Sequence, residues 1–392
     1  MSGAYLLAPQ RTPIGKFLGG LAGFTAPQLA AISLRATLTA AGIEPQQVYE
    51  VILGEVVTAG VGQAPARQAA LLGGLPDSVA ALTINKVCGS GLKAVMLADQ
   101  IIRSGDARVI VAGGMESMSQ APHLLPGSRV GWKYGPQTMV DSLVNDGLWC
   151  ASEKTAMGEL AEWTAAKCGL TRERQDALAA ESHRRAIAAR DAGKFTAEIV
   201  PVTVTGKTPV TISADEGPRA ETSAAKLAAL RPAFMTGVTV TAGNSSQLSD
   251  GAATVLVVDQ ETARASSAPL KAQIVATATS GGPPRELFLA PIAAVEKVLA
   301  KAGWTRESVD LFELNEAFAA QALACIDGLQ LSTDKVNVNG GAIALGHPIG
   351  ASGARVLVTL LHALADRGGT RGIAALCLGG GNAVAVAVER VS

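Results

Sequence analysis

Aromatic residues are scarce in this chain of 392 residues, at 4%, whereas glycine occurs 43 times. The interior must therefore be built from alanine, valine, leucine and isoleucine, with many turns that glycine permits. Neither sign of charge is in excess, because 33 lysine and arginine residues balance 33 aspartate and glutamate residues. This balance argues against a protein that binds nucleic acid or a membrane surface through bulk positive charge.

Cysteines and long apolar runs are also few. Five cysteines are too scattered for a disulfide-stabilised scaffold, and none has the C-x-x-C spacing of a zinc site. The first ten residues lack the basic flank of a signal peptide. The apolar tract 372–388 is interrupted by three glycines and an asparagine, which indicates buried strands and a turn, not a membrane span. We therefore expect a soluble, cytoplasmic protein, with two or three domains at ~150 residues each.

An internal repeat organises the chain. Residues 41–55 (AGIEPQQVYEVILGE) match residues 302–316 (AGWTRESVDLFELNE) without a gap, at an offset of 261. Further along, Gly89-Ser90-Gly91 matches Ala351-Ser352-Gly353 at an offset of 262. Each of these triplets precedes a helical pattern, a strand pattern and a glycine turn. Two collinear matches at nearly one offset predict a duplicated half-molecule.

The apolar pattern of both halves predicts strands between helices. Residues 107–112 and 373–378 are apolar on both faces, which suits strands in sheets that helices cover. Residues 119–248 lie outside the repeat. They contain polar loops, a charged helical pattern over 171–193 and a region rich in proline and glycine over 201–219. We interpret this stretch as an insertion in the first half that builds a binding surface.

Cys88 is the first candidate for chemistry. It follows an expected strand over 82–87 and precedes an apolar helix that begins near Ser90. The positive end of a helix dipole lowers the pKa of a thiol, and the glycines on either side of Ser90 let a substrate approach the backbone. The pattern predicts either a nucleophilic thiol or a small buried residue at a tight turn.

His347 is the second candidate. The other three histidines have ordinary settings: His123 in a proline-flanked loop, His183 on a charged helix and His362 on an exposed helix face. His347 alone is embedded in glycines just before a helix. The repeat places it at the same end of its sheet as Cys88, where an imidazole can take a thiol proton or polarise a carbonyl oxygen. A structural turn residue is the alternative.

Cys377 and Asn315 each stand at the end of an expected strand. Cys377 precedes the glycine run 379–381, which offers unobstructed backbone N–H groups of the kind an oxyanion hole needs. Taken alone, Cys377 is typical of an inert core cysteine, and Asn315 of a residue that satisfies nearby backbone. The duplicated topology nevertheless brings all four candidates to one end of the sheets, where α/β active sites form.

These residues lie in motifs that resemble those of the thiolase family, in the family's order and over nearly the whole chain. The motifs are VCGSG (87–91), GGMESMS (113–119), NEAFA (315–319), GHPIGASG (346–353) and CLGGG (377–381). The acetyl-CoA acetyltransferases are the branch that matches best. The resemblance implies an α/β fold, a duplicated α/β/α/β/α sandwich with an inserted loop domain. Its first half would comprise residues 1–118 plus 249–268, the loop domain residues 119–248, and the second half residues 269–392.

The resemblance also implies catalytic roles in the reversible condensation of two acetyl-CoA molecules. Cys88 is acylated, His347 activates its thiol, and Cys377 exchanges the α-proton of the second substrate. A water on Asn315 forms one oxyanion hole with His347, and the N–H groups of Cys88 and Gly379 form the other. The kinetics are ping-pong, and no metal or redox cofactor is needed because coenzyme A is itself substrate and product.

The substrate residues are likewise implied by the resemblance. Arg219 matches a position near the nucleotide of coenzyme A, and Ser246 a position on its pantetheine arm. Further residues are expected to line the pantetheine and acyl tunnel: Leu148, Met157, Phe234, Ala317 and Phe318. The family also assembles as dimers through the core halves and as tetramers through the inserted loops.

Two segments depart from the family's short-chain pattern. Ala156 stands where a histidine is usual, and Leu287-Phe288-Leu-Ala-Pro291 replaces Met-Gly-x-Gly-Pro. Both border the expected acyl pocket, so a 3-ketoacyl-CoA thiolase of broader, longer-chain or ketoadipyl type is an alternative. A decarboxylating ketoacyl synthase would lack Cys377. A non-catalytic acyl-CoA-binding relative would lack at least one of Cys88, His347 and Cys377, and all three are present.

Overall fold

The computed structural model describes residues 3–234 and 238–391. The first half contributes five strands to a large mixed sheet: β1 (Tyr5–Arg11), β3 (Glu50–Gly54), β4 (Ala80–Ile84), β5 (Val109–Ser117) and β12 (Ser249–Val258). β3 runs parallel to β4 and β5, whereas β12 runs antiparallel to β5 and β1. The short β2 (Gly15–Lys16) pairs with the start of β12.

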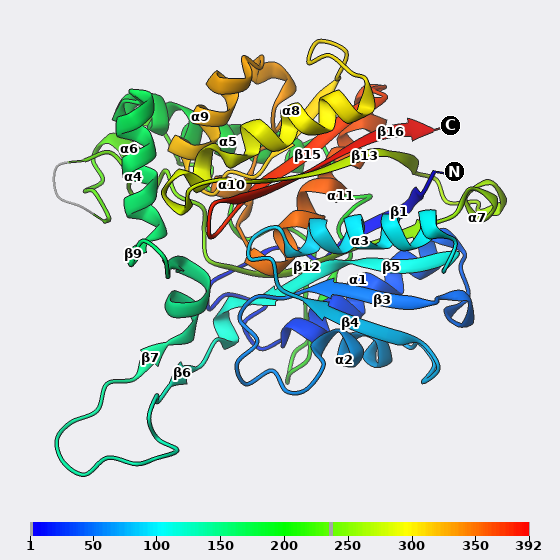
Figure 1. Cartoon of the computed structure of the whole chain (residues 1–392), viewed down its shortest axis with the longest axis horizontal. Coiled ribbons are helices and arrows are strands. Elements are labelled where there is room, and N and C mark those ends of the chain that lie inside the picture. The colour runs from blue at the N-terminus through cyan, green and yellow to red at the C-terminus, as the bar shows by residue number, and fades with distance from the viewer. Residues whose placement is uncertain (1–2, 235–237, 392) are drawn as a thin grey trace.

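The second half contributes four strands: β13 (Lys271–Gly281), β14 (Leu311–Leu314), β15 (Arg371–Leu378) and β16 (Asn382–Val391). The strand order is β14-β15-β16-β13-β1-β12-β5-β3-β4. The two halves join where β1 pairs with β13, from Tyr5 opposite Gln273 to Leu7 opposite Lys271. One continuous sheet therefore runs through both halves, with β4 and β14 at its edges (Figure 1).

Helices form three further layers. α3 (Ser90–Ser104) and α11 (Ile349–Arg367) lie between the two halves of the sheet and contact strands of both. α1 (Ala26–Ala41) and α2 (Pro65–Leu72) cover the outer face of the first half, and α8 (Ala290–Ala302) and α9 (Ala319–Leu329) pack on the second. The expected duplicated α/β/α/β/α sandwich is confirmed. Short α7 (Gln260–Ala265) and α10 (Ala342–Leu345) complete the two halves.

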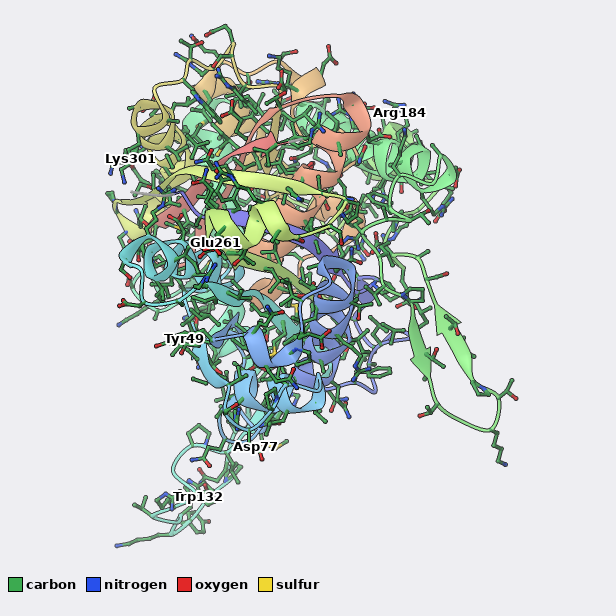
Figure 2. All side chains as sticks on the ribbon, turned by 90° about the vertical axis from the view of Figure 1, so that its right-hand side faces the viewer. Tyr49, Asp77, Trp132, Arg184, Glu261 and Lys301 are labelled. Carbon is green, nitrogen blue, oxygen red and sulfur yellow. The ribbon has the colours of Figure 1, made fainter. Side chains whose placement is uncertain are left out.

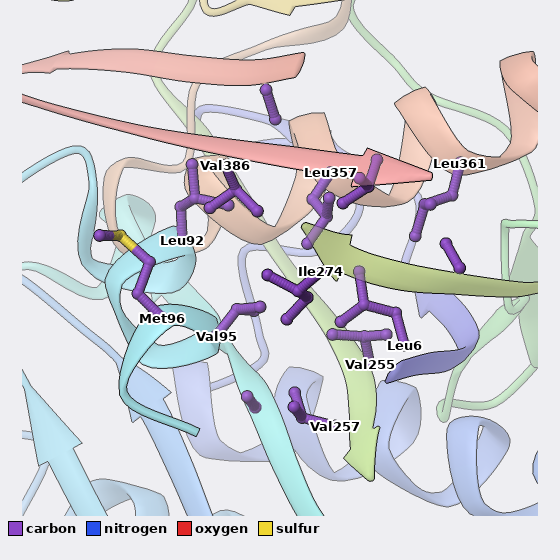
Figure 3. Close-up of a cluster of buried hydrophobic side chains, with 14 of the residues drawn as sticks. Leu6, Leu92, Val95, Met96, Val255, Val257, Ile274, Leu357, Leu361 and Val386 are labelled. Atoms are coloured by element: carbon purple, nitrogen blue, oxygen red, sulfur yellow. The ribbon is translucent and has the colours of Figure 1, made fainter. Parts of the chain in front are cut away.

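Small residues allow the two central helices to touch. A β-carbon at Gly91 of α3 would collide with the backbone nitrogen of Ala354, and one at Gly353 of α11 with that of Leu92. These reciprocal contacts join the positions that the sequence repeat pairs. The surrounding core is aliphatic, as the scarcity of aromatics predicts (Figure 3). α11 is long and apolar enough to cross a membrane, but 83% of its apolar window is buried inside the protein.

The insertion between β5 and β12 packs beside the second half. It contains α4 (Met157–Cys168), α5 (Arg172–Asp191), α6 (Ala224–Ala228) and the short strands β6 (His123–Leu124), β7 (Val140–Asp141), β8 (Trp149–Cys150), β9 (Thr155–Ala156), β10 (Val202–Val204) and β11 (Val210–Ile212). α5 coincides with the charged helical pattern, and Thr171 caps it by accepting a hydrogen bond from the Arg174 N–H. Two hairpins, β6–β7 and β10–β11, project from the body (Figures 1 and 2).

Candidate active site

One pocket collects most of the candidate residues. It has a volume of about 240 Å³ and opens between the insertion and the ends of strands from both halves. Cys88, His347, Cys377 and Gly379 line it together. Its remaining walls are almost entirely apolar, so polar groups in it interact with little competition from water.

Cys88 reaches this pocket from the turn between β4 and α3. The expected strand over 82–87 stops at Ile84, because residues 85–87 form the turn that leads to the helix. Val87 has a φ of 47°, a conformation that β-branched residues rarely adopt. The Ser90 hydroxyl holds the turn by donating to the Val87 carbonyl oxygen (2.6 Å) and accepting from the Lys86 N–H (2.8 Å). Strain of this kind is typical of functional sites.

The expected lowering of the Cys88 pKa is wrong for the free protein. Part of the side chain is accessible from the pocket, but desolvation raises the pKa of the thiol to about 12. The nearby carboxylate of Glu116 raises the pKa further, and the backbone N–H groups of Cys88 and Gly379 oppose both effects by stabilising the thiolate. Cys88 therefore rests as a neutral thiol and needs a base. The same two N–H groups are the predicted oxyanion hole.

His347 is placed to be that base. Burial, with a smaller contribution from Arg355, lowers the pKa of the imidazole to about 3, so the ring is neutral at physiological pH. Its Nδ1 lies 2.6 Å from the Ser352 hydroxyl oxygen, and its Nε2 lies 3.5 Å from the Asn315 side-chain nitrogen. Its backbone N–H donates to the carbonyl oxygen of Gln247 (3.0 Å). The ring is thus contacted at both nitrogens and its backbone is anchored, and the residue lines the pocket.

Cys377 and Asn315 complete the constellation from the second half. Burial raises the pKa of the Cys377 thiol well above its ordinary value, and the proximity of Cys88 raises it further. A thiolate formed there is consequently a strong base. Asn315 is buried against His347, and its Oδ1 has no hydrogen-bond partner among the described residues. That oxygen is available to hold a water molecule, as the predicted oxyanion hole requires.

Most of the predicted substrate residues lie on the pocket wall. Those that line it are Leu148, Met157, Phe234, Ser246, Ala317 and Phe318. Arg219 does not line it. Its side chain is exposed, and its backbone N–H donates to Nδ1 of His183 (3.1 Å). The assignment of Arg219 to the nucleotide therefore stays a prediction.

The segments that depart from the short-chain pattern do border the pocket. Ala156, Leu287 and Phe288 all line it. The ring of Phe288 packs edge-on against Phe318, with 5.3 Å between centroids, and the ring of Phe234 also packs edge-on against Phe318, at 6.2 Å. Three of the seven phenylalanines in the chain thus gather at one wall. Composition could not locate this cluster, because its members come from three distant segments.

Sequence reasoning missed two further features. The Glu116 carboxylate, in the GGMES motif, accepts hydrogen bonds from the backbone N–H groups of Val56 (3.1 Å), Val57 (3.2 Å) and Gly350 (2.9 Å), which ties both halves together beside Cys88. Burial raises the pKa of Glu116 to about 7. His362 is half-buried where an exposed position was expected, because its Nε2 bonds the Pro9 carbonyl oxygen (3.0 Å). Within the described residues, no group of three or more His, Cys, Asp or Glu could hold a metal ion.

Comparison with known proteins places these observations in a family. The chain matches Thiolase, N-terminal domain, over residues 4–261 and Thiolase, C-terminal domain, over residues 268–390. It is 54% identical over 387 residues to the acetyl-CoA acetyltransferase of Chromobacterium violaceum, with 98% of this chain and 99% of that protein covered. It is 52% identical to the acetyl-CoA acetyltransferase of Pseudomonas aeruginosa over the full length of both. The crystal structure of the Bacillus anthracis acetyl-CoA acetyltransferase matches with a TM-score of 0.97 at 41% identity, covering 100% of this chain and 99% of that one.

Proposed function

The chain belongs to the thiolase family, and we propose that it catalyses the reversible condensation of two acetyl-CoA molecules to acetoacetyl-CoA and coenzyme A. The observation that carries the proposal is the meeting of Cys88, His347 and Cys377 in one apolar pocket. Each supplies a group that the chemistry needs: a nucleophile, a base for its thiol and a base for an α-proton. Relatives of about half identity over the full length bear the name of this activity.

The first half-reaction forms an acyl-enzyme. Nε2 of His347 takes the proton of the Cys88 thiol as the sulfur attacks the thioester carbonyl carbon. The carbon–sulfur bond to coenzyme A then breaks, and the departing coenzyme A thiolate takes a proton from Cys377. The N–H groups of Cys88 and Gly379 stabilise the negative oxygen of the tetrahedral intermediate. The products are acetyl-Cys88, protonated His347, the Cys377 thiolate and free coenzyme A.

The second half-reaction forms the carbon–carbon bond. The Cys377 thiolate removes an α-proton from the second acetyl-CoA, and its raised pKa makes it a strong enough base for a weak carbon acid. A water on Asn315 and the protonated His347 stabilise the enolate oxygen. The enolate carbon attacks acetyl-Cys88, Cys88 leaves as a thiolate, and His347 returns its proton. All three residues regain their starting protonation states, so the cycle closes.

The pocket supports a short acyl group. Its 240 Å³ is below the ~300 Å³ at which ligand pockets begin, which suits a thin pantetheine arm with a small acyl end. The buried ring of Phe288 fills space on the acyl wall. Ala156 acts in the opposite sense, because its single methyl group leaves room beside Met157. Ala156 is the observation that favours the second candidate, a 3-ketoacyl-CoA thiolase of broader chain length.

Thiolysis by the purified protein separates the two candidates. Coenzyme A would be supplied with acetoacetyl-CoA, a ketohexanoyl-CoA or a long-chain ketoacyl-CoA, each beside a Cys88→Ala control. We expect activity on acetoacetyl-CoA that the control lacks. Preference for the longer chains would move the protein to the second candidate, and Ala156→His should then restore the short-chain preference. A folded protein inactive on all three would overturn the proposal.

Assembly and conditions complete the proposal. We propose a homodimer through the edge strand β4, where Leu82 is exposed, and a tetramer through the β6–β7 arm. The arm supports the latter because Val130 (90%), Tyr134 (98%) and Met139 (63%) are largely exposed there. Light scattering of the wild type, and of a variant with these three residues changed to serine, would test this assembly.

We also propose that the enzyme works in the cytoplasm without metal or redox cofactor, because its chemistry uses free thiols. Activity should survive a metal chelator.

A further inference from the structure

We propose that Ser352 is a positioning residue that holds His347 as the tautomer with its proton on Nδ1, which leaves Nε2 as the unprotonated nitrogen that can take the proton of Cys88. The inference rests on the proposed function for the role of His347 as the base. It adds the group that selects which ring nitrogen performs the step. A neutral imidazole carries one N–H and one acceptor nitrogen, so this selection decides whether the ring can act as a base toward the pocket.

Two contacts of the ring assign the tautomer. The Ser352 hydroxyl has one proton, and it donates this proton to the Pro348 carbonyl oxygen at 2.8 Å. Its oxygen is then the acceptor for the contact to Nδ1 at 2.6 Å, so Nδ1 carries the hydrogen. On the other side, the Asn315 side-chain nitrogen can only donate, and it lies 3.5 Å from Nε2. Both contacts leave Nε2 as the acceptor nitrogen.

The internal repeat supports the direction of these hydrogen bonds. Ser90 is the residue that the repeat pairs with Ser352, and each serine lies at the N-terminal end of its central helix. Ser90 accepts a hydrogen bond from the Lys86 backbone N–H, because a backbone N–H can only donate. The hydroxyl proton of Ser90 therefore goes to the Val87 carbonyl oxygen. Ser352 has the same pair of contacts, with the imidazole N–H in place of the backbone N–H. In the second half, the serine that stabilises a turn in the first half contacts a side chain.

The setting makes the assignment stable. Ser352 is 0% exposed and His347 is 6% exposed, so solvent offers Nδ1 no competing partner. The ring contacts of His183 and His362 differ from those of His347. Nδ1 of His183 accepts from the Arg219 N–H, and Nε2 of His362 donates to the Pro9 carbonyl oxygen. Among the contacts recorded for these three rings, the one at His347 is the one in which Nδ1 donates.

Nitrogen-15 NMR of histidine-labelled protein tests the tautomer without any turnover. The chain has four histidines, and the spectrum of a His347→Ala variant identifies the signals of His347. We expect a protonated Nδ1 for His347, against a protonated Nε2 for His183 and His362 in the same spectrum. In Ser352→Ala we expect the His347 signals to shift toward a protonated Nε2. A protonated Nε2 in the wild type, or an unchanged tautomer in Ser352→Ala, would overturn the inference.

Kinetics test the consequence. Ser352→Ala should lower kcat/KM for acetoacetyl-CoA thiolysis about 10- to 100-fold, less than the full ~10²–10⁴-fold contribution of a general base. Most of the loss should fall on kcat, because the substrate keeps its contacts, and Ser352→Thr should restore the rate by restoring the hydroxyl. A rate within twofold of wild type in Ser352→Ala would contradict the inference.

Ser33→Ala is the matched control. Ser33 is also a helical serine with 0% exposure, and its hydroxyl bonds Thr254 Oγ1 (2.6 Å) and the Gln10 carbonyl oxygen (3.1 Å), far from the pocket. Loss of a buried hydroxyl by itself should therefore affect stability equally in both variants, and the rate only in Ser352→Ala. An equal loss of rate in both would assign the effect to packing. Full activity in His347→Ala would instead overturn the proposed function, whatever the tautomer.

Discussion

The N-terminal ends of α3 and α11 are built alike and used differently. Each has a serine whose hydroxyl donates to a carbonyl oxygen three or four residues earlier, and each presents its preceding loop to the same pocket. In the first half that loop carries the nucleophile, Cys88. In the second half it carries His347, and the serine accepts from the imidazole where Ser90 accepts from a backbone N–H. Duplication therefore supplied one structural device twice, and the active site needs both copies because each half supplies only part of the chemistry.

The glutamates that the repeat pairs have diverged further. Glu316 accepts hydrogen bonds from the Ser182 hydroxyl (2.7 Å), the Asn337 side-chain nitrogen (2.9 Å) and the Ile343 N–H (3.3 Å), which ties the insertion to the second half. Both carboxyl oxygens of Glu55 lack a hydrogen-bond partner among the described residues. Burial, and then the nearby Glu116, raise the pKa of Glu55 to about 8. The first half has retained the residue without its anchoring role.

Among the changes at the two helix ends, removal of Cys88 should have the largest effect on activity. We expect Cys88→Ala to lower the rate of thiolysis by roughly 10⁴-fold or more, because the covalent route disappears. The melting temperature should change little, since the side chain is small and partly accessible. Initial rates with acetoacetyl-CoA and coenzyme A provide the measurement. A variant that keeps wild-type activity would show that the nucleophile lies elsewhere.

Removing Cys377 would separate the two half-reactions. In Cys377→Ala, Cys88 should still accept an acetyl group, with the leaving thiolate protonated by solvent. The condensation and thiolysis rates should fall by about 10³-fold, because no base removes the α-proton. Intact-protein mass spectrometry would detect the acetylated form, and turnover assays the loss. The division of labour between the two thiols would be wrong if the variant formed no acyl-enzyme.

The paired glutamates offer a smaller, thermodynamic test. Glu316→Gln should lower the free energy of unfolding by about 1–3 kcal/mol, because an amide nitrogen replaces one of the two oxygens that accept these buried hydrogen bonds. Glu55 has a raised pKa in the folded state, so stability is highest below the ordinary glutamate pKa and is lost progressively as the pH rises from there through about 8. Glu55→Gln should therefore leave stability unchanged near pH ~4, where the carboxyl is protonated in both states, and increase it by roughly 3–5 kcal/mol near pH ~9. Urea unfolding at both pH values checks this, and the absence of a pH effect would contradict the burial of Glu55.

The pH dependence of Cys88 alkylation tests the protonation states of the two residues that the helix ends present, Cys88 and His347. Because desolvation raises the pKa of Cys88 to about 12 and lowers that of His347 to about 3, neither group titrates between these values in the free protein. Alkylation by iodoacetamide should rise about tenfold per pH unit from pH ~6 to ~9, as the thiolate fraction does. A plateau above neutral pH would instead indicate a preformed thiolate–imidazolium pair. Protection by acetyl-CoA assigns the reaction to Cys88.

Much of the fold follows from local pattern. The repeat identified two halves, and the triplets around Ser90 and Ser352 located both central helices, although α11 begins at Ile349, before its triplet. Strands apolar on both faces predicted sheets covered by helices, and a threonine cap with charged periodicity located α5. These features depend on residues close together in sequence. Strand lengths depend on partners: β5 extends to Ser117, past the expected end at residue 112, because β12 pairs with it along its whole length.

The residues that line the site could be predicted from the sequence, but their pKa values could not. A helix dipole argument uses only the turn around Cys88, whereas the desolvation that raises its pKa comes from segments far away in sequence. Ser352, the partner of His347, belongs to the same motif, GHPIGASG. Spacing alone does not show that its hydroxyl contacts the ring. Arg219 lies outside the pocket wall. Its backbone N–H donates to His183 on a helix, and no sequence motif indicates this contact.

The most direct test of the account is to find where an acetyl group attaches. The wild-type protein would be incubated with acetyl-CoA, quenched in acid and digested, and each cysteine-containing peptide examined by mass spectrometry. The account predicts an acetyl group on Cys88 that coenzyme A removes, with none on the other four cysteines. A protein that stays unmodified, or that carries the acetyl group on another cysteine, would contradict the claim that the two halves build one thiolase site around Cys88.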